Sequence, residues 1–157
     1  MTVTTLARDL PDLFEAEINN QLEGLLGYQL RRTSLAMGAD LVIRLEPLGL
    51  TLITMSILLL VESNPGITQS EIGRRLAIKR ANMAPLTAQL SDKGLIDRVR
   101  SDGRSHGLSL TSGGQDLACR AREHVRANEA RFLSRLRPGE QTVLADLLLR
   151  VRGAGDG

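Results

Sequence analysis

The chain contains 157 residues, of which 42% are hydrophobic, so it is long enough to bury the core of one domain. Its net charge is only +2, so any strongly basic surface must be local. A single cysteine excludes an intrachain disulfide and fits a reducing cytoplasm. The first residues, MTVTTLARDLPDLFEAEI, lack a positively charged segment followed by an apolar one, so no signal peptide is predicted.

The first 48 residues are predicted to be helical. Pro11 suits the first turn of a helix that Asp9 caps, and apolar residues then recur at spacings of three and four. These residues are Phe14, Ile18, Leu22, Leu25, Leu26, Leu30, Met37 and Leu41. A break is expected at Gly38 or at Pro47, so the region forms one helix or two. The next segment, Leu50 to Val61, is strongly apolar but too short to span a bilayer, and it predicts a buried helix.

Two short helices joined by a tight turn are predicted between Ile67 and Gly94. Thr68 and Glu71 form a capping box, which starts a helix that runs from about Gln69 to Leu76. A second apolar series ends at Gly94, a residue type that commonly terminates helices. Its members are Ile78, Met83, Leu86 and Leu90. Such a helix-turn-helix unit places its second helix in the major groove of DNA.

Basic residues are concentrated in this part of the chain. From Thr68 to Arg104 there are eight Lys and Arg residues against four acidic residues, a surplus of +4 where the whole chain has +2. The rest of the chain therefore carries −2, and the basic segment is predicted to meet phosphate.

A β-hairpin is predicted directly after the second helix. Leu95 to Arg100 forms its first strand, Asp102-Gly103 is a strong turn signal, and Gly107 to Leu110 alternates like a returning strand. A hairpin in this place is a wing, whose tip residue Arg104 can enter a minor groove while Asp102 holds its guanidinium. The alternative is that these arginines form only a solvated surface.

The N-terminal end of the second helix is predicted to read the bases. Arg80 can pair with guanine O6 and N7, and Asn82 with adenine N6 and N7. The alternative is that Lys79 and Arg80 contact only phosphate. Pro85 is expected to distort the helix and to face a thymine methyl group. The predicted DNA contacts are Ser70, Arg74, Arg75, Lys79, Arg80, Asn82, Ala84, Pro85, Arg98, Arg100, Asp102 and Arg104.

Two further helices are predicted after the hairpin. Thr111 is the expected N-cap of a helix over Gln115 to Leu136, and Pro138 starts the last helix. The last helix has an apolar stripe that comprises Val143, Leu144, Leu147, Leu148 and Val151. Cys119 is expected to be a small core residue, with a redox sensor as the alternative. Residues 153–157 have no apolar surface to bury and are expected to be disordered.

Signals of catalysis are absent from the sequence. His106, His124 and Cys119 are isolated from one another, so no metal spacing is formed and no metal or cofactor is predicted. Gly113-Gly114 lacks the further glycines and the lysine of a phosphate loop. The chain is therefore not expected to be an enzyme.

The chain resembles the MarR family of bacterial winged helix-turn-helix transcriptional regulators from about Gln21 to Val151. Gly103 stands where the family usually has arginine, which keeps the Asp-x-Arg pair at the wing tip but removes one positive charge. The matching segments are Gly49-Leu50-Thr51, Thr68 to Leu76, Leu90 to Arg98, Asp102-Gly103-Arg104 and Leu110 to Gly114.

The resemblance implies a mainly α fold with a small β-wing and a homodimer formed through both chain ends. The implied regions are N-terminal dimerisation helices (1–48), the winged unit (49–111), C-terminal dimerisation helices (112–152) and a tail (153–157). Operator DNA would be released when a small molecule, such as an aromatic acid or its coenzyme A thioester, binds between dimer helices and the winged unit. Implied effector contacts are Tyr28, Arg31, Arg32, Met55 and His124, although these arginines can also be solvated and His124 can be an interface residue. A constitutive architectural or protein-interaction module without an effector is the alternative function.

Overall fold

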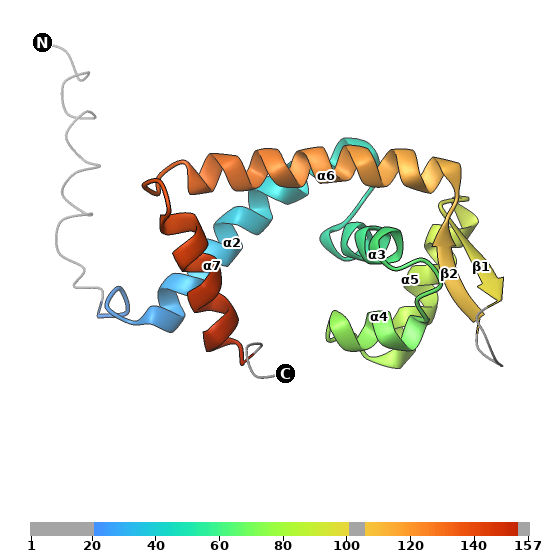
Figure 1. Cartoon of the computed structure of the whole chain (residues 1–157), viewed down its shortest axis with the longest axis horizontal. Coiled ribbons are helices and arrows are strands. Elements are labelled where there is room, and N and C mark those ends of the chain that lie inside the picture. The colour runs from blue at the N-terminus through green and yellow to red at the C-terminus, as the bar shows by residue number, and fades with distance from the viewer. Residues whose placement is uncertain (1–20, 101–105, 154–157) are drawn as a thin grey trace, which may run out of the picture. The chain divides into compact units, whose positions relative to one another are not determined.

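The computed structural model describes residues 21–100 and 106–153, and it confirms a mainly helical fold with a small two-stranded wing (Figure 1). The expected first helix around Phe14 and the end of the tail lie outside the described residues. The boundary between two compact units of the chain falls within one helix, between Ala36 and Met37. The elements are α2 (Leu26–Leu45), the 3₁₀ turn η1 (Glu46–Leu48), α3 (Leu52–Ser63), α4 (Gln69–Arg75), α5 (Arg80–Asp92), β1 (Ile96–Arg100), β2 (His106–Leu110), α6 (Ser112–Leu133) and α7 (Glu140–Val151).

The helix α2 passes through Gly38 without a break, which corrects one of the two expected break points. A Cβ carbon at Gly38 would meet only Leu52 Cδ1, at 3.7 Å, so the backbone is under no pressure to bend there. The chain turns instead at η1, which contains Pro47 and ends at Gly49 in the left-handed conformation (φ 63°). Glycine adopts that conformation without steric cost, so the second expected break point is confirmed.

The buried helix predicted from the apolar run is α3. Thr51 caps it, because its hydroxyl accepts from the backbone N–H of Thr54 at 3.2 Å, and the Thr54 side chain accepts in return from Thr51. Ile57, Leu58 and Val61 are fully buried in the core that α3 shares with the winged unit and α6. Burial of each such side chain stabilises the fold by roughly 1.5–3 kcal/mol.

The wing is an antiparallel pair in which Ile96 lies opposite Leu110 and Arg100 lies opposite His106. The strands agree with the predicted ones, whereas the predicted turn lies in residues 101–105, outside the described part of the chain. Beyond the pair, Leu108 forms a backbone bridge with the segment before α4. Its N–H donates to the carbonyl of Ile67 at 2.9 Å, and its carbonyl accepts from Gly66 at 2.8 Å. The wing is therefore tied to the start of the helix-turn-helix unit.

The helix α6 begins at Ser112, three residues before the predicted start, because the hydroxyl of its cap Thr111 accepts from Gly114 N–H at 3.0 Å. It packs along α3, and Figure 1 shows α3, α4, α5 and the wing gathered near the beginning of α6. Arg122 of α6 forms an ion pair with Glu62 of α3. The N-terminal part of α6 therefore holds the core helix directly.

A second polar contact joins α6 to the end of α2. Asn128 is only 3% exposed, and its amide donates to the Met37 carbonyl at 3.0 Å and to the Asp40 carboxylate at 2.9 Å. Asp40 also accepts from Arg44 at 2.5 Å and pairs with Arg131. These hydrogen bonds hold the pKa of Asp40 below its ordinary value, with Arg44 as the largest cause.

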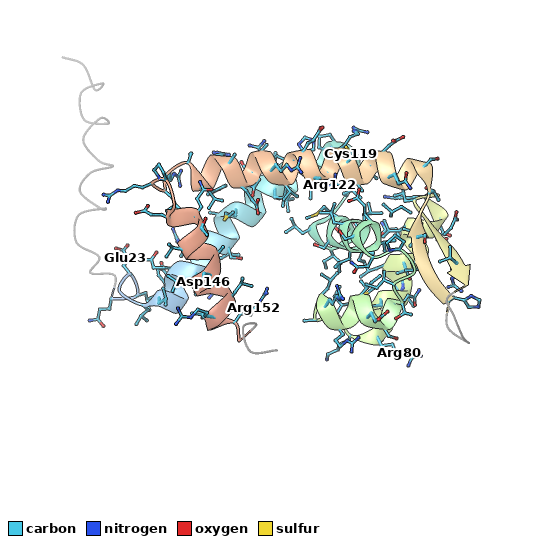
Figure 2. The ribbon with its side chains drawn as sticks, viewed as in Figure 1. Glu23, Arg80, Cys119, Arg122, Asp146 and Arg152 are labelled. Carbon is cyan, nitrogen blue, oxygen red and sulfur yellow. The ribbon has the colours of Figure 1, made fainter. Side chains whose placement is uncertain are left out.

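Cys119 is exposed on α6, so its expected place in the core was wrong (Figure 2). Successive helical residues point about 100° apart, and Ala118 and Ala121 are the ones fully buried against the core. Cys119 therefore lies on the outer side of the same turn.

No residue of α7 is buried in a single chain, although the helix has the predicted apolar stripe. Val143 is 58% exposed and Leu147 is 46% exposed. Among the described residues no single helix is long and apolar enough to cross a membrane; only the bent pair Leu26–Leu48 and Leu52–Ser63 meets that test, by length and composition alone.

Candidate nucleic-acid interface

The helix-turn-helix unit is built from the predicted signals. At the start of α4, the Thr68 hydroxyl accepts from Glu71 N–H at 3.3 Å, and the Thr68 N–H donates to the Glu71 carboxylate at 2.9 Å. These bonds, with a further one from the Thr68 hydroxyl, hold the pKa of Glu71 below its ordinary value. The capping box is thus confirmed, and it fixes where α4 begins.

Close packing fixes how α4 meets α5. A Cβ carbon at Gly73 would come within 3.0 Å of the Ile78 carbonyl and 3.1 Å of the Met83 side chain. The turn between the helices passes through Ala77, which has a positive φ of 54°. The absence of a side chain at Gly73 therefore allows the two helices to approach each other.

The spacing of apolar residues did not predict the burial of one polar residue of α5. Thr87 is 2% exposed, and its hydroxyl lies 2.6 Å from the Gln69 amide nitrogen and 3.0 Å from the Met83 carbonyl. It lies on the same inward face as Met83 and Leu90, as the helical spacing requires. This bond joins α4 to α5 halfway along the recognition helix.

The residues of α5 that are predicted to read DNA are exposed. Lys79 is the N-cap residue, and Arg80, Asn82, Ala84 and Pro85 are all exposed (Arg80 is labelled in Figure 2). The helix runs unbroken from Arg80 to Asp92 through Pro85, so the expected distortion does not interrupt it. The structure thus leaves these side chains on the exposed surface of α5, and their contact with DNA stays a prediction.

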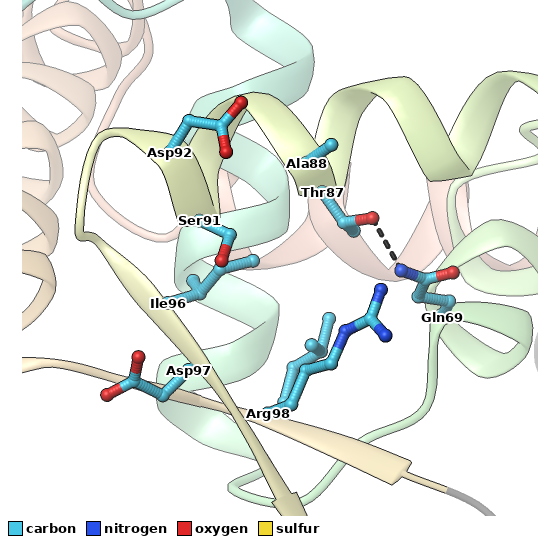
Figure 3. A pocket seen from close by; sticks show the side chains of 9 residues that line it. Gln69, Thr87, Ala88, Ser91, Asp92, Ile96, Asp97 and Arg98 are labelled. Carbon is cyan, nitrogen blue, oxygen red and sulfur yellow. Dashed lines mark hydrogen bonds between the residues drawn. The ribbon is translucent and has the colours of Figure 1, made fainter.

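Arg98 of β1 lies beside this surface, in a hollow of about 210 Å³ between α5 and the wing (Figure 3). In the close view its guanidinium points toward the Gln69 amide and Thr87, whereas the Asp97 carboxylate points away from it. Arg98 therefore directs its charge into the junction between the helix-turn-helix unit and the wing.

None of the described salt bridges neutralises a basic residue of this surface, so these residues can pair with phosphate. All four salt bridges lie outside the helix-turn-helix unit and wing, and they join Arg44 and Arg131 to Asp40, Arg122 to Glu62, and Arg150 to Asp146. The exposed residues are Ser70, Arg74, Arg75, Lys79 and Arg80, and none of the four basic side chains among them has a salt bridge with a described residue. Of the other predicted contacts, Arg100 lies at the end of β1, and Asp102 and Arg104 lie outside the described residues.

The predicted effector contacts fall in both compact units. Tyr28, Arg31 and Arg32 lie on the first part of α2, and the Arg32 guanidinium is 5.9 Å from the centre of the Tyr28 ring. In the second unit, Met55 is a core residue that is 7% exposed, and His124 is half-buried on α6. Because each unit is described by itself, a common pocket for the five side chains stays a prediction. Among the described residues, no three His, Cys, Asp or Glu side chains gather as metal ligands.

Known proteins that are similar to this chain are transcriptional regulators. The sequence profile of the MarR family matches residues 48–105. The HTH-type transcriptional repressor Rv2887 of Mycobacterium tuberculosis is 36% identical over 118 residues, which cover 74% of this chain and 85% of that protein. The crystal structure of Rv2887 with salicylic acid has a TM-score of 0.66, with 34% identity over 80% of this chain and 95% of that one.

A second relative, the transcriptional repressor CouR, is known in two bound forms. CouR bound to a 23-mer DNA duplex matches with a TM-score of 0.79 and 35% identity, covering 87% of this chain and 99% of that chain. CouR bound to p-coumaroyl-CoA matches with a TM-score of 0.73 and 34% identity, covering 86% of this chain and 97% of that chain.

Proposed function

Because this chain belongs to the MarR family of transcriptional regulators, we propose that it is a repressor that binds operator DNA and releases it when a small molecule binds. It would act in the cytoplasm as a homodimer on a pseudo-palindromic site. The effector we propose is an aromatic acid or its coenzyme A thioester, since Rv2887 has been crystallised with salicylic acid and CouR with p-coumaroyl-CoA.

The proposal that this chain binds DNA rests on the exposed basic surface of α4, α5 and β1. Phosphate contacts supply most of the sequence-independent affinity for DNA, and they need cations that are not already neutralised. Lys79, Arg80 and Arg98 meet that need, because none of them has a salt bridge with a described residue. Asn82 and Arg80 at the start of α5 are then the candidates for reading base edges.

The dimer is supported by the exposed apolar stripe of α7. Soluble proteins rarely leave such a surface in water, and a two-fold axis would bury it against a second copy. The two recognition helices of a dimer would then reach half-sites about one helical turn apart.

The proposal of an aromatic effector rests on the pairing of an aromatic ring with a cation on α2. Tyr28 is the chain's single tyrosine, and Arg32 already lies over its ring. An aromatic acid needs both a stacking surface and a cation, because burying an unpaired carboxylate costs several kcal/mol. To release DNA, the effector must bind one dimer conformation more tightly than the other.

A selection experiment tests both parts. The full chain would be used to enrich DNA duplexes from a random pool, and binding of the enriched duplex would be measured by fluorescence anisotropy. We expect enrichment of a sequence with two-fold symmetry, and release when salicylate or p-coumaroyl-CoA is added. Failure to enrich any duplex would refute the DNA-binding proposal. Enrichment with no release, and no thermal stabilisation by a wider panel of aromatic acids, would favour the constitutive module instead.

A further inference from the structure

The junction between the recognition helix and the wing must face a DNA strand if the proposed function is correct, and the following inference rests on it. The recognition helix enters the major groove, and the wing reaches the neighbouring minor groove. These two grooves are separated by one sugar–phosphate backbone. A backbone phosphate therefore passes the junction where β1 and β2 meet the start of α4.

The backbone bridge at Leu108 makes this junction rigid. Its two hydrogen bonds, to Ile67 and from Gly66, are 2.9 and 2.8 Å long. A side chain at Gly107 would bring its Cβ carbon within 2.2 Å of the Gly66 carbonyl oxygen, so only glycine allows the approach. The side chains on either side of the bridge are thus held at fixed positions.

A hollow of about 220 Å³ opens at this junction, and none of the described residues that line it is acidic. Its lining comprises Thr68, Gln69, Ser70, Arg98, His106 and Leu108. The nearest acidic residue of α4 in sequence is Glu71, whose carboxylate accepts two hydrogen bonds from Thr68. Among the described residues, the titratable and charged groups that line the hollow are Arg98 from β1 and His106 from β2.

The strand register places these two groups on the same face of the wing. Arg98 lies opposite Leu108 and Arg100 lies opposite His106, so Arg98 and His106 are diagonal neighbours across the pair. His106 is exposed, and neither Arg98 nor His106 has a salt bridge with a described residue.

We propose that Arg98 and His106 together hold one backbone phosphate of bound DNA, and that the imidazole joins this contact when it is protonated. Histidine gains its charge within the range of about pH 5 to 8. A phosphate beside the imidazole favours the protonated form, so DNA binding takes up a proton at this site. The affinity for DNA consequently rises as the pH falls, and Arg98 supplies a contact that does not depend on pH.

The experiment compares wild type, His106→Gln and His106→Arg on the enriched duplex and on a duplex of unrelated sequence, at about pH 6 and about pH 8. We expect the wild type to bind roughly tenfold more tightly at the lower pH, because a charge-assisted hydrogen bond is gained. Its salt slope should also be steeper there by about 0.9, one phosphate contact. His106→Gln should bind weakly at both pH values, and His106→Arg tightly at both, on both duplexes.

Each other outcome overturns the proposal. The chain has two histidines, so a pH dependence that survives in His106→Gln and disappears in His124→Gln would assign the effect to α6 instead. Equal binding by wild type and His106→Gln at both pH values would remove His106 from the DNA contact. Failure of the wild type to bind either duplex at any pH would instead refute the proposed function, and thermal unfolding of each variant confirms that it is folded.

Discussion

The carbonyl oxygen of Gly66 lies so close to Gly107 that a Cβ carbon added at Gly107 would stand 2.2 Å from it. This approach allows the segment before α4 to pair with β2 at Leu108, and it therefore couples the helix-turn-helix unit to the wing. Gly66 and Gly107 are 41 residues apart in the chain, yet their contact decides where Arg98 and His106 lie relative to α4.

Gly107→Ala is expected to destabilise the protein by about 1–3 kcal/mol, because the added methyl group forces the two backbone segments apart. Gly113→Ala is the matched control, since a Cβ carbon there meets nothing closer than 3.8 Å. That change should alter the free energy of unfolding by no more than about 1 kcal/mol, and in the stabilising direction. Urea denaturation checks both variants, and equal stability of the two would mean that the Gly66–Gly107 contact imposes no constraint.

Asp40→Asn is expected to lower the thermal midpoint near neutral pH. The side chain of Arg44 is the largest cause that holds the pKa of Asp40 below its ordinary value of 3.8, followed by Asn128, while Arg131 adds a favourable charge. A lowered folded-state pKa stabilises the fold above the unfolded-state pKa, and this contribution is lost as the pH falls through the folded-state value.

The stability difference between wild type and Asp40→Asn should therefore be constant above about pH 5 and shrink below about pH 4. Asp146→Asn serves as the control, because its pair with Arg150 is 3.7 Å long and the Asp146 side chain is 66% exposed. It should leave the thermal midpoint unchanged. A difference between wild type and Asp40→Asn that grows toward acid would contradict the assigned role of the Asp40 carboxylate.

Much of this architecture could be predicted from the sequence, because the local signals act over a few residues. The pair Thr68 and Glu71 marked the start of α4, and Gly94, which has a φ of 66°, marked the end of α5. These features depend on neighbours in the chain and not on the tertiary fold, so spacing alone was sufficient.

The errors arose where tertiary contacts decide the outcome. Burial of Thr87 depends on Gln69, eighteen residues away, and no apolar pattern signals a polar core residue. The exposure of Cys119 depends on which face of α6 meets α3, and one position along a helix changes that face. His106 had no functional signal in the sequence, because Arg98 becomes its diagonal neighbour only when the two strands pair.

Leu147→Glu is expected to convert the proposed dimer into monomers, because it places a charge in the middle of the apolar stripe of α7. Leu149→Glu is the matched control, since residues 147 and 149 point about 200° apart on a helix. Both leucines are 46% exposed in the single chain, so the two changes differ mainly in the face that they alter. Light scattering would measure the mass, and dimers of both variants would exclude this stripe from the interface.

Arg32→Ala is expected to lose the response to effector while it keeps its affinity for DNA. Its guanidinium lies over the Tyr28 ring, where an aromatic anion can find both a stacking surface and a charge. Arg31 points about 100° away on the helix, so Arg31→Ala should respond like the wild type. Gel-shift titrations with salicylate and p-coumaroyl-CoA compare the two variants, and DNA release by both at wild-type concentrations would place the pocket elsewhere.

The most direct test of the DNA-binding surface is the salt dependence of affinity for the enriched duplex. Lys79→Ala/Arg80→Ala removes two exposed cations from the start of α5, and Arg120→Ala/Arg126→Ala removes two exposed cations from α6 with the same change in net charge. The first variant should bind more than tenfold more weakly, with a salt slope shallower by about 0.9 if Lys79 alone contacts phosphate and by about 1.8 if Arg80 does so too, whereas the second should match the wild type. An unchanged slope in the first variant, or equal losses in both, would contradict the account that α4, α5 and the wing form the DNA-binding surface.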